Sequence, residues 1–334
     1  TTTLTGARKA KENLNKNSIH VYFPFDLKFI CKKFINFYKP SILLLVETEI
    51  WPNLINVFNE FELPVVLVNG RLSNKSLKKY QRLNFFFKSS FNKINHAFVQ
   101  SKNDFERFYE AGVKEDAMSV TGSIKFDANS ASPKNFNENE INYYKEKYVF
   151  VCGSTHPGEE EILIESFIDL KKENKHLVLA PRHPERFNEI KELLKEKKLT
   201  SIFYTEISSN PNDKSDVTIV DVIGRLLDFY EIADYVFIGG TLVDHGGQNF
   251  LEPAYFHKPI ISGRSTYNFE EISKKLEDLD LLRFVSNKDE ITHAIENMEA
   301  ISDPLKQEID LWLDESRGAS KFISQKICEK FKLI

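Results

Sequence analysis

Short apolar runs alternate with longer amphipathic segments along most of the chain. Segments such as residues 27–38 and 159–173 carry apolar side chains at helical spacing, and the runs between them have the length of buried strands. The strand candidates are residues 18–23, 41–46, 64–69, 97–100, 148–152, 176–180, 202–204, 217–220, 235–238 and 259–262. Strands that alternate with helices predict parallel sheets covered on both faces, which is an α/β fold.

The strand rhythm stops in residues 129–146, a polar stretch rich in Asn, Ser and Glu. A chain of 334 residues suits two domains of ordinary size. We expect a first Rossmann-like domain over residues 1–130, a linker over 131–147 and a second Rossmann-like domain over 148–315. A final helix is expected over 305–331, and residues 316–334 can pack back on the first domain.

The composition is that of a globular protein, with 41% hydrophobic and 28% charged residues. A net charge of -4 argues against a general nucleic-acid-binding protein. The three cysteines, Cys31, Cys152 and Cys328, lack metal-ligand spacing, so no structural zinc is expected. We expect no other cofactor either. No apolar run reaches the roughly 20 residues of a spanning helix, and no signal peptide is visible.

The most informative segment follows the strand candidate 235–238. Gly239 and Gly240 allow a sharp turn there, and a second glycine pair precedes a helix expected to begin at Asn249. Free backbone N–H groups and the positive end of that helix would attract a phosphate, and Glu252 in its first turn could accept hydrogen bonds from ribose hydroxyls. Taken alone, glycine pairs more often mark ordinary turns.

Polar side chains also follow two other strands of the second half. Arg182, in Pro181-Arg182, could contact a cytidine or a phosphate, or it could pair with Glu185 or a neighbouring carboxylate. Ser154 and Thr155 could contact a ligand or cap the next helix. The acidic residues 159–161 are expected only to complement that helix's dipole. Since ligands of open α/β sheets bind at the carboxyl ends of the strands, these groups point to one site.

The first half offers carboxylates and a lysine at similar positions. Glu47 and Glu49 follow a strand, so one should point toward a ligand and the other away. Lys125 could stabilise developing negative charge or lie on the surface. Cationic residues interleave with aromatic ones over 75–88, a pattern that could meet a membrane surface, although Phe85–Phe87 could also be core.

Several motifs occur together and in a recognisable order. They are Glu47-Thr48-Glu49-Ile50-Trp51-Pro52-Asn53, Asn69-Gly70-Arg71, Gln100-Ser101, Thr121-Gly122-Ser123-Ile124-Lys125-Phe126-Asp127, Gly153-Ser154-Thr155-His156-Pro157-Gly158-Glu159-Glu160, Pro181-Arg182-His183-Pro184-Glu185-Arg186 and the glycine segment 239–253. In this series the chain resembles the Kdo transferases, which move 3-deoxy-D-manno-octulosonate (Kdo) from CMP-Kdo to the lipid A precursor. The resemblance extends over nearly the whole chain.

The resemblance implies the GT-B architecture, in which two Rossmann-like domains face a central cleft. It implies a glycosyltransferase that inverts the anomeric centre without a metal, with CMP-Kdo as donor, the lipid A precursor lipid IVA as acceptor, and a place on the cytoplasmic face of the bacterial inner membrane. The cytidine site would be lined, mainly through backbone groups, by Ile223, Gly224, Arg225, Asn249, Phe250, Leu251 and Glu252. Arg225 stands where an acidic residue is common in the family, which leaves its role open.

By the same resemblance, Lys125 would face the donor's carboxylate or the transition state, and Glu49 or Glu47 would lie near the acceptor. The opening residues 1–6 resemble a loop that family members carry inside their first domain. We therefore expect an anchor helix, a first strand and the catalytic base to precede this chain. Two other interpretations stay open: a catalytically dead CMP-binding fragment, or a GT-B enzyme acting on a UDP-sugar, such as an epimerase.

Overall fold

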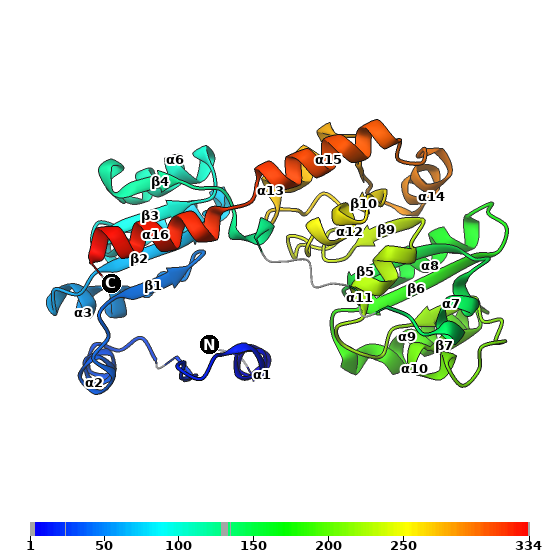
Figure 1. Ribbon diagram of the computed structural model, residues 1–334, viewed down its shortest axis with the longest axis horizontal. Coiled ribbons are helices and arrows are strands. Elements are labelled where there is room, and N and C mark those ends of the chain that lie inside the picture. The colour runs from blue at the N-terminus through cyan, green and yellow to red at the C-terminus, as the bar shows by residue number, and fades with distance from the viewer. Residues whose placement is uncertain (1–3, 24, 128–132, 134, 333–334) are drawn as a thin grey trace. The chain divides into compact units, whose positions relative to one another are not determined.

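The computed structural model describes residues 4–23, 25–127, 133 and 135–332, and the chain forms two compact units (Figure 1). Unit 1 combines residues 1–127 with 316–334, and unit 2 comprises residues 128–315. The expectations for residues 1–3, for residues 128–130 of the first domain and for residues 131, 132 and 134 of the linker lie outside the described residues.

Unit 1 is built on a four-stranded parallel sheet with the order β1-β2-β3-β4. Its strands are β1 (Leu43–Val46), β2 (Val65–Gly70), β3 (His96–Val99) and β4 (Met118–Val120). Its helices are α1 (Leu4–Asn13), α2 (Lys28–Tyr38), α3 (Pro52–Glu60), α4 (Asn74–Arg82), α5 (Asn84–Phe91), α6 (Lys102–Ala111) and α16 (Ala319–Phe331), with short 3-10 turns η1 (Glu115–Ala117) and η2 (Ile124–Phe126).

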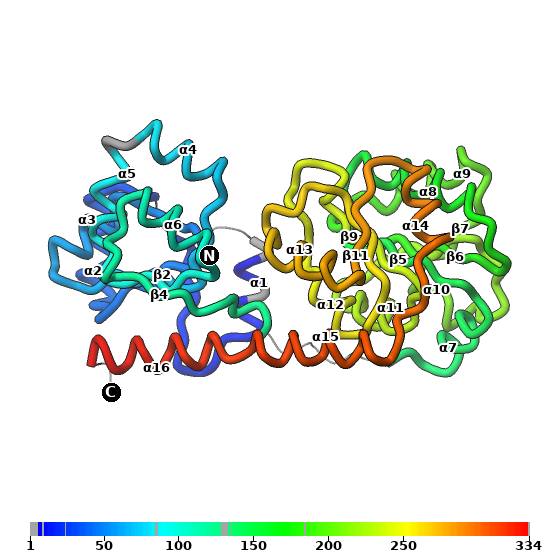
Figure 2. The backbone as a smooth tube through the Cα atoms, turned by 90° about the horizontal axis from the view of Figure 1, so that it is seen from above, coloured from blue at the N-terminus to red at the C-terminus, as the bar shows by residue number. Residues whose placement is uncertain are grey.

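Alternate side chains of β2 serve two different cores. Val65 and Leu67 pack with α2, α3, α5 and α6, whereas Val66 packs with Ile323 and Ile327 of α16. The sheet of unit 1 therefore lies between α16 and the layer that contains α3, α5 and α6 (Figure 2). This two-sided burial explains why β2 reads as a continuous apolar run.

The expected strand over residues 18–23 is wrong, because this segment runs as irregular chain. β1 pairs with β2 alone among the described strands and forms an edge of the sheet. Ile19 is 78% exposed, so the segment buries little of the apolar surface that a strand would need to cover. Phe23 does pack, with its ring centroid 4.7 Å from that of Trp51.

Unit 2 contains a seven-stranded parallel sheet with the order β11-β10-β9-β5-β6-β8-β7. Its strands are β5 (Tyr148–Thr155), β6 (Lys175–Pro181), β7 (Ser201–Phe203), β8 (Val217–Ile219), β9 (Tyr235–Ile238), β10 (Ile260–Ser262) and β11 (Leu282–Phe284). Its helices are α7 (Glu138–Tyr144), α8 (Glu159–Asp169), α9 (Phe187–Glu196), α10 (Tyr204–Ile207), α11 (Leu226–Ile232), α12 (Leu251–Tyr255), α13 (Glu270–Asp278), α14 (Lys288–Asn297) and α15 (Asp303–Glu315), with the 3-10 turn η3 (Pro184–Arg186). Helices α8, α9 and α14 bury one face of this sheet.

The polar stretch between the units is shorter than the linker expected over 131–147. Residues 138–144 form α7, whose N-terminus is closed by a capping box between Asn137 and Glu140. Tyr143 and Tyr144 of this helix are buried. The Asn and Glu residues that resemble linker composition are thus helix-capping groups of unit 2.

The single helix expected over 305–331 is also wrong, since it is divided into α15 and α16. Gly318 precedes α16 with a φ of 103°, a conformation that favours glycine. The carboxylate of Asp127 accepts hydrogen bonds from the backbone N–H groups of Gly318 and Ser320, the latter at 2.6 Å. Helix α16 belongs to unit 1, and Lys330 Nζ lies 2.8 Å from His96 Nδ1.

Candidate functional site

The carboxyl end of β5 and the loop that follows β9 are in direct contact in unit 2. A Cβ atom at Gly239 would lie 2.1 Å from the carbonyl oxygen of Ser154, so only glycine fits there. A Cβ atom at Gly153 would lie 2.0 Å from the hydroxyl oxygen of Tyr230 in α11. These glycines let the carboxyl ends of the central strands close on one another, at the edge where α/β proteins bind ligands.

Glu159 holds the glycine turn in place. Its buried carboxylate accepts backbone N–H groups of Gly240 at 2.7 Å, Thr241 at 2.9 Å and Leu242 at 3.0 Å, and of His156 at 2.9 Å. Burial raises the pKa of this carboxyl, while the backbone N–H groups oppose the rise. The expectation that Glu159 only complements a helix dipole is wrong, because it organises the turn after β9.

The glycine segment consequently differs from the expected phosphate cradle. The amides of residues 240–242 donate to Glu159, Gly246 N donates to Ser265 Oγ, and Gly247 N donates to Gly240 O. The following helix begins at Leu251 rather than Asn249 and has only 5 residues. A helix of this length adds little positive potential, so cationic side chains must supply more of the charge for an anion.

Thr155 is buried and donates its hydroxyl hydrogen bond to Glu160 Oε1 at 2.9 Å. The same carboxylate pairs with Arg186 at 2.6 Å. Thr155 therefore neither caps the N-terminus of α8 through a backbone N–H nor turns its hydroxyl toward solvent. Ser154 is half-buried, with a φ of 56°, a conformation uncommon for a residue other than glycine. Such strained residues cluster at functional sites.

Arg182 lies at the end of β6, directly after Pro181, and its side chain is exposed. Its backbone N–H donates to Thr155 O at 2.9 Å, which joins the first residue after β6 to the last residue of β5. The structure, which describes both residues, shows no ion pair between Arg182 and Glu185, and the carboxylate of Glu185 lies 3.4 Å from His183 Nδ1 instead. Arg182 thus presents a guanidinium at the carboxyl edge of the sheet.

The side chain of Arg225 contacts other groups of unit 2. Its guanidinium lies over the rings of Phe136 and Tyr204, at 5.4 and 5.3 Å from their centroids, and Nε lies 2.8 Å from Asp228. A further ion pair of 3.6 Å joins it to Glu140 of α7. The residue that departs from the family pattern therefore joins α7, α10 and α11. Its neighbours Ile223, which is 70% exposed, and Gly224, with a φ of 85°, leave their backbone near the surface.

The segment that carries Glu252 contributes mainly backbone groups. Phe250 and Leu251 are buried, so their side chains belong to the core of unit 2. Asn249 Nδ2 donates to Glu252 Oε1 at 3.1 Å. Burial is the main cause that raises the pKa of Tyr230, the tyrosine that packs on Gly153, and the charge of Glu252 contributes to the rise.

Unit 1 has its own cluster at the carboxyl edge of its sheet. Glu47, after β1, lies 3.4 Å from Lys125 Nζ in the turn after β4. Burial lowers the pKa of Lys125, Glu47 opposes this effect, and Arg71 adds to it. Glu47 and Asn69 both have positive φ angles, of 56° and 54°, and Asn69 Oδ1 accepts the backbone N–H of Ile124. The turn that carries Lys125 is thus fixed to the end of β2.

The two neighbouring carboxylates of unit 1 point to different partners. Glu49 accepts a hydrogen bond from Trp51 Nε1 at 2.9 Å, whereas Glu47 faces Lys125.

The basic and aromatic segment 75–88 contains both exposed and packed aromatic side chains. Phe86 is 64% exposed, while Phe87 packs against Tyr80 with ring centroids 4.7 Å apart. The side chain of Phe85 lies outside the described residues.

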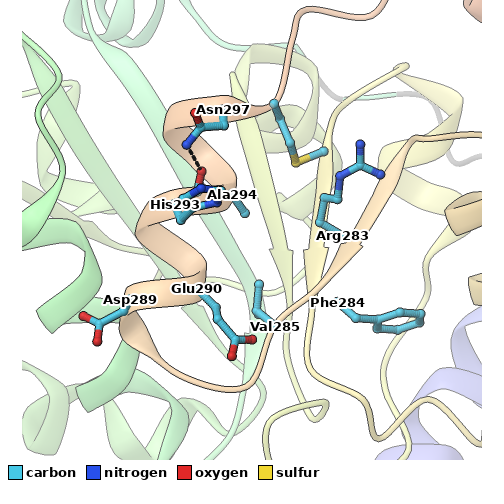
Figure 3. Close-up of a pocket in the computed structure, with 9 residues that line it drawn as sticks. Arg283, Phe284, Val285, Asp289, Glu290, His293, Ala294 and Asn297 are labelled. Atoms are coloured by element: carbon cyan, nitrogen blue, oxygen red, sulfur yellow. Dashed lines mark hydrogen bonds between the residues drawn. The ribbon is translucent and has the colours of Figure 1, made fainter.

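A cavity of about 450 Å³ lies between β11 and α14 in unit 2 (Figure 3). It is lined by Arg283, Phe284, Val285, Asp289, Glu290, His293, Ala294, Asn297 and Met298. None of these is a site residue expected from the sequence, so the cavity is separate from the predicted nucleotide site.

Within residues 4–332, apart from the gaps, no group of three or more His, Cys, Asp or Glu side chains is arranged to hold a metal ion. In the same residues no helix combines the length and the apolar character required to cross a bilayer.

The arrangement of two Rossmann-like units on one chain defines the GT-B class. A structure of Staphylococcus aureus MnaA with UDP covers 100% of this chain and 88% of its own, with a TM-score of 0.62 and 17% identity. The UDP-GlcNAc 2-epimerase of Neisseria meningitidis, bound to UDP-GlcNAc, covers 98% and 88%, with a TM-score of 0.60 and 12% identity. These likenesses concern the fold.

The sequence comparisons are more specific. The family model of 3-deoxy-D-manno-octulosonic-acid transferase (kdotransferase) matches residues 1–128. The 3-deoxy-D-manno-octulosonic acid transferase of Haemophilus influenzae is 35% identical over 301 residues, which are 89% of this chain and 70% of that protein. The chain belongs to the Kdo transferase family. A bifunctional glycosyltransferase/methyltransferase of Fusobacterium nucleatum is 37% identical over 339 residues. The match includes 99% of this chain and 51% of the relative.

Sequence reasoning missed three histidines at the carboxyl edge of unit 2. His156 follows β5, His183 follows β6 and His245 follows β9. The imidazoles of His156 and His245 are stacked with centroids 4.4 Å apart, and His183 lies edge-on at 5.8 Å from His156. Each residue comes shortly after a predicted strand, and neighbouring parallel strands share an edge. This rule, applied to histidines, could have grouped them.

Proposed function

We propose that this chain carries out glycosyl transfer from CMP-Kdo to a hydroxyl of the lipid A precursor, with inversion and without a metal. Family membership supports the donor class. The observation that carries the assignment is the exposed guanidinium of Arg182 at the edge where the loops after β5, β6 and β9 meet. A guanidinium pairs well with a phosphate oxygen, so this edge suits the phosphate of a nucleotide.

In the proposed reaction, an acceptor hydroxyl oxygen forms a bond to the anomeric carbon of Kdo as the bond from that carbon to the phosphate oxygen breaks. The departing electron pair goes to CMP, and a carboxylate base takes the hydroxyl proton. Cationic side chains hold the charge that develops on the phosphate. Glu252 would accept hydrogen bonds from the ribose, and the backbone of residues 223–224 and 249–251 would contact the cytidine.

The Glu47–Lys125 pair of unit 1 supports a role at the sugar. Lys125 is largely removed from water and is held by a turn that is fixed to Asn69, which are the conditions for a preorganised cation. We propose that Lys125 meets the carboxylate of the donor sugar and that Glu47, rather than Glu49, lies beside the reacting groups. Glu49 would then orient Trp51.

The acceptor and the membrane surface are proposed to meet helices α4 and α5. Lys75, Lys78, Lys79 and Arg82 are exposed on α4, and Leu83 and Phe86 are exposed beside them. A surface that combines cations with apolar side chains suits an anionic lipid headgroup region. On this basis we propose that the protein acts at the cytoplasmic face of the bacterial inner membrane.

The test compares CMP with UDP binding by calorimetry, using the chain and its Glu252→Ala variant. We expect selective CMP binding that weakens at least tenfold in the variant, the equivalent of about 1.4 kcal/mol. Glu173→Ala, which changes an exposed carboxylate between α8 and β6, is the matched control and should bind as the parent does. Equal binding of CMP and UDP, or none, would contradict the proposal.

A second measurement separates binding from turnover. The chain is incubated with CMP-Kdo and the lipid acceptor in detergent, and release of CMP is followed. CMP binding with turnover at background would favour a nucleotide-binding chain without catalysis. Tighter binding of UDP than CMP would favour a GT-B enzyme acting on a UDP-sugar.

A further inference from the structure

Three imidazoles and one guanidinium gather where the loops after β5, β6 and β9 meet. His156 lies between His245, stacked at 4.4 Å with an interplanar angle of 19°, and His183, edge-on at 5.8 Å. Gln248 Nε2 lies 3.3 Å from His156 Nε2. The backbone at Gly240 makes room for this group, since a Cβ atom there would lie 3.3 Å from both His156 and His245.

The backbone N–H groups at this edge already have acceptors, so side chains must bind an anion here. Those of Gly240, Thr241 and Leu242 already donate to the carboxylate of Glu159. A phosphate that entered here would meet the guanidinium of Arg182 and the imidazoles instead. An imidazole differs from a guanidinium because it gains or loses a proton near neutral pH.

The charges around His156 make its protonation sensitive to an added anion. Burial is the main cause that lowers the pKa of His156 to about 4, and the positive charges of His245, His183, Arg182 and Arg186 contribute to this value. The nearby carboxylates have partners of their own. Those of Glu159, Glu160 and Glu185 engage backbone N–H groups, Arg186 and His183 respectively. A phosphate dianion beside the cluster would favour the charged imidazolium forms.

We propose that His156, His183 and His245, with Arg182, form a proton-coupled phosphate site that takes up a proton when a phosphate monoester binds. The proposal rests on the proposed function and deepens it. Cleavage of the donor converts a phosphodiester with one negative charge into a nucleoside monophosphate that carries a second one near neutral pH. The proton released by the acceptor hydroxyl balances that charge, and the histidine cluster holds a proton against the departing phosphate.

The experiment is a calorimetric titration of the full chain with CMP at pH 7.5 in two buffers of different ionisation enthalpy. The difference in observed heat gives the number of protons taken up. We expect net uptake with CMP and none with cytidine, which has no phosphate. We also expect the CMP affinity to fall by up to about tenfold for each pH unit above neutrality.

Variants locate the proton. His245→Gln and His183→Gln change exposed side chains and should fold, and each should reduce the uptake and flatten the pH dependence. His293→Gln, an exposed histidine of α14 outside the cluster, should leave both unchanged. The ³¹P resonance of bound CMP should show a dianionic phosphate, which assigns the proton to the protein.

CMP binding without proton uptake, or with uptake that persists in both cluster variants, would overturn this inference and leave the proposed function standing. A bound phosphate that is itself protonated would overturn it as well. The absence of any CMP binding would overturn both the inference and the proposed function.

Discussion

The carboxylate of Glu159 accepts the backbone N–H of Gly240 at 2.7 Å, although the two residues are far apart in the sequence. Both are buried, and the same carboxylate also receives the amides of Thr241 and Leu242. A protein anion therefore occupies the position in the glycine turn that sequence patterns assign to a ligand phosphate.

Replacing Glu159 by Ala should destabilise unit 2 strongly. Several buried N–H groups would lose their acceptor, and we expect the free energy of unfolding to fall by about 3–5 kcal/mol, as measured by urea denaturation. The matched control is Glu161→Ala, because Glu161 is exposed and its ion pair with Lys197 is long, at 3.7 Å. That variant should change stability by less than about 1 kcal/mol. Equal losses in the two variants would contradict the role given to Glu159.

Arg225→Ala should also destabilise unit 2, without acting through nucleotide contacts of its side chain. The buried carboxylate of Asp228 would lose its cation, which costs about 3–5 kcal/mol in buried ion pairs. Arg225→Lys keeps the charge but loses the planar group over Phe136 and Tyr204, so an intermediate loss is expected. Thermal unfolding checks both, with Arg283→Ala at an exposed ion pair as control. A stable Arg225→Ala protein with weakened CMP binding would instead indicate a ligand contact.

The ion pair between Glu47 and Lys125 should be measurable by a double-mutant cycle. Glu47→Gln, Lys125→Met and the double variant should give a coupling free energy of about 1 kcal/mol, since both side chains are only partly exposed. Because Glu47 raises the pKa of Lys125, the Glu47→Gln change should lower that pKa further, which NMR of the lysine side chain can follow. Glu49→Gln serves as the control and should not couple with Lys125. A pKa of Lys125 that rises in Glu47→Gln would refute the pairing.

Acid should loosen α16 from unit 1 through His96. Burial, together with the charge of Lys330, lowers the pKa of His96 to about 4. The unfolded chain binds the proton more readily, so this contribution to stability is complete above about pH 6.5 and is lost as the pH falls toward 4. The parent and His96→Gln should be compared by denaturation at several pH values. Between about pH 6.5 and pH 4, the free energy of unfolding of the parent should fall by on the order of 2 kcal/mol more than that of the variant. His293→Gln should keep the parent's profile, and so would His96→Gln if the assignment were wrong.

Strands that have a neighbouring strand on each side in the sheet could be predicted from the sequence. β5 and β9 in unit 2 occur close to where their apolar runs predicted them, because such strands need little beyond hydrophobicity. Residues 18–23 have a similar apolar pattern but no partner strand, and pattern alone does not contain that information. β11 was missed for a related reason, since Leu282–Phe284 includes Arg283 and lies at an edge.

The location of the candidate site at the carboxyl edge of the sheet could be predicted from the sequence, but the contacts between its residues could not. The position of Arg182 after a strand placed it correctly on the exposed carboxyl side. By contrast, the bond from Glu159 to the turn after β9 joins residues that only the folded chain brings together. For the same reason the inward role of Arg225 could not be read from its neighbours, because Phe136 and Tyr204 come from other elements.

The boundary of unit 1 has a consequence for biosynthesis. Its residues lie on both sides of unit 2 in the sequence, and α16 supplies Ile323 and Ile327 to the core formed with Val66 and Phe98. On the ribosome the sheet of unit 1 is made first, while the helix that covers this face emerges only after all of unit 2. Unit 2, which is continuous, can fold while unit 1 waits with an uncovered apolar face, so a nascent chain halted before α16 should be the form most in need of a chaperone.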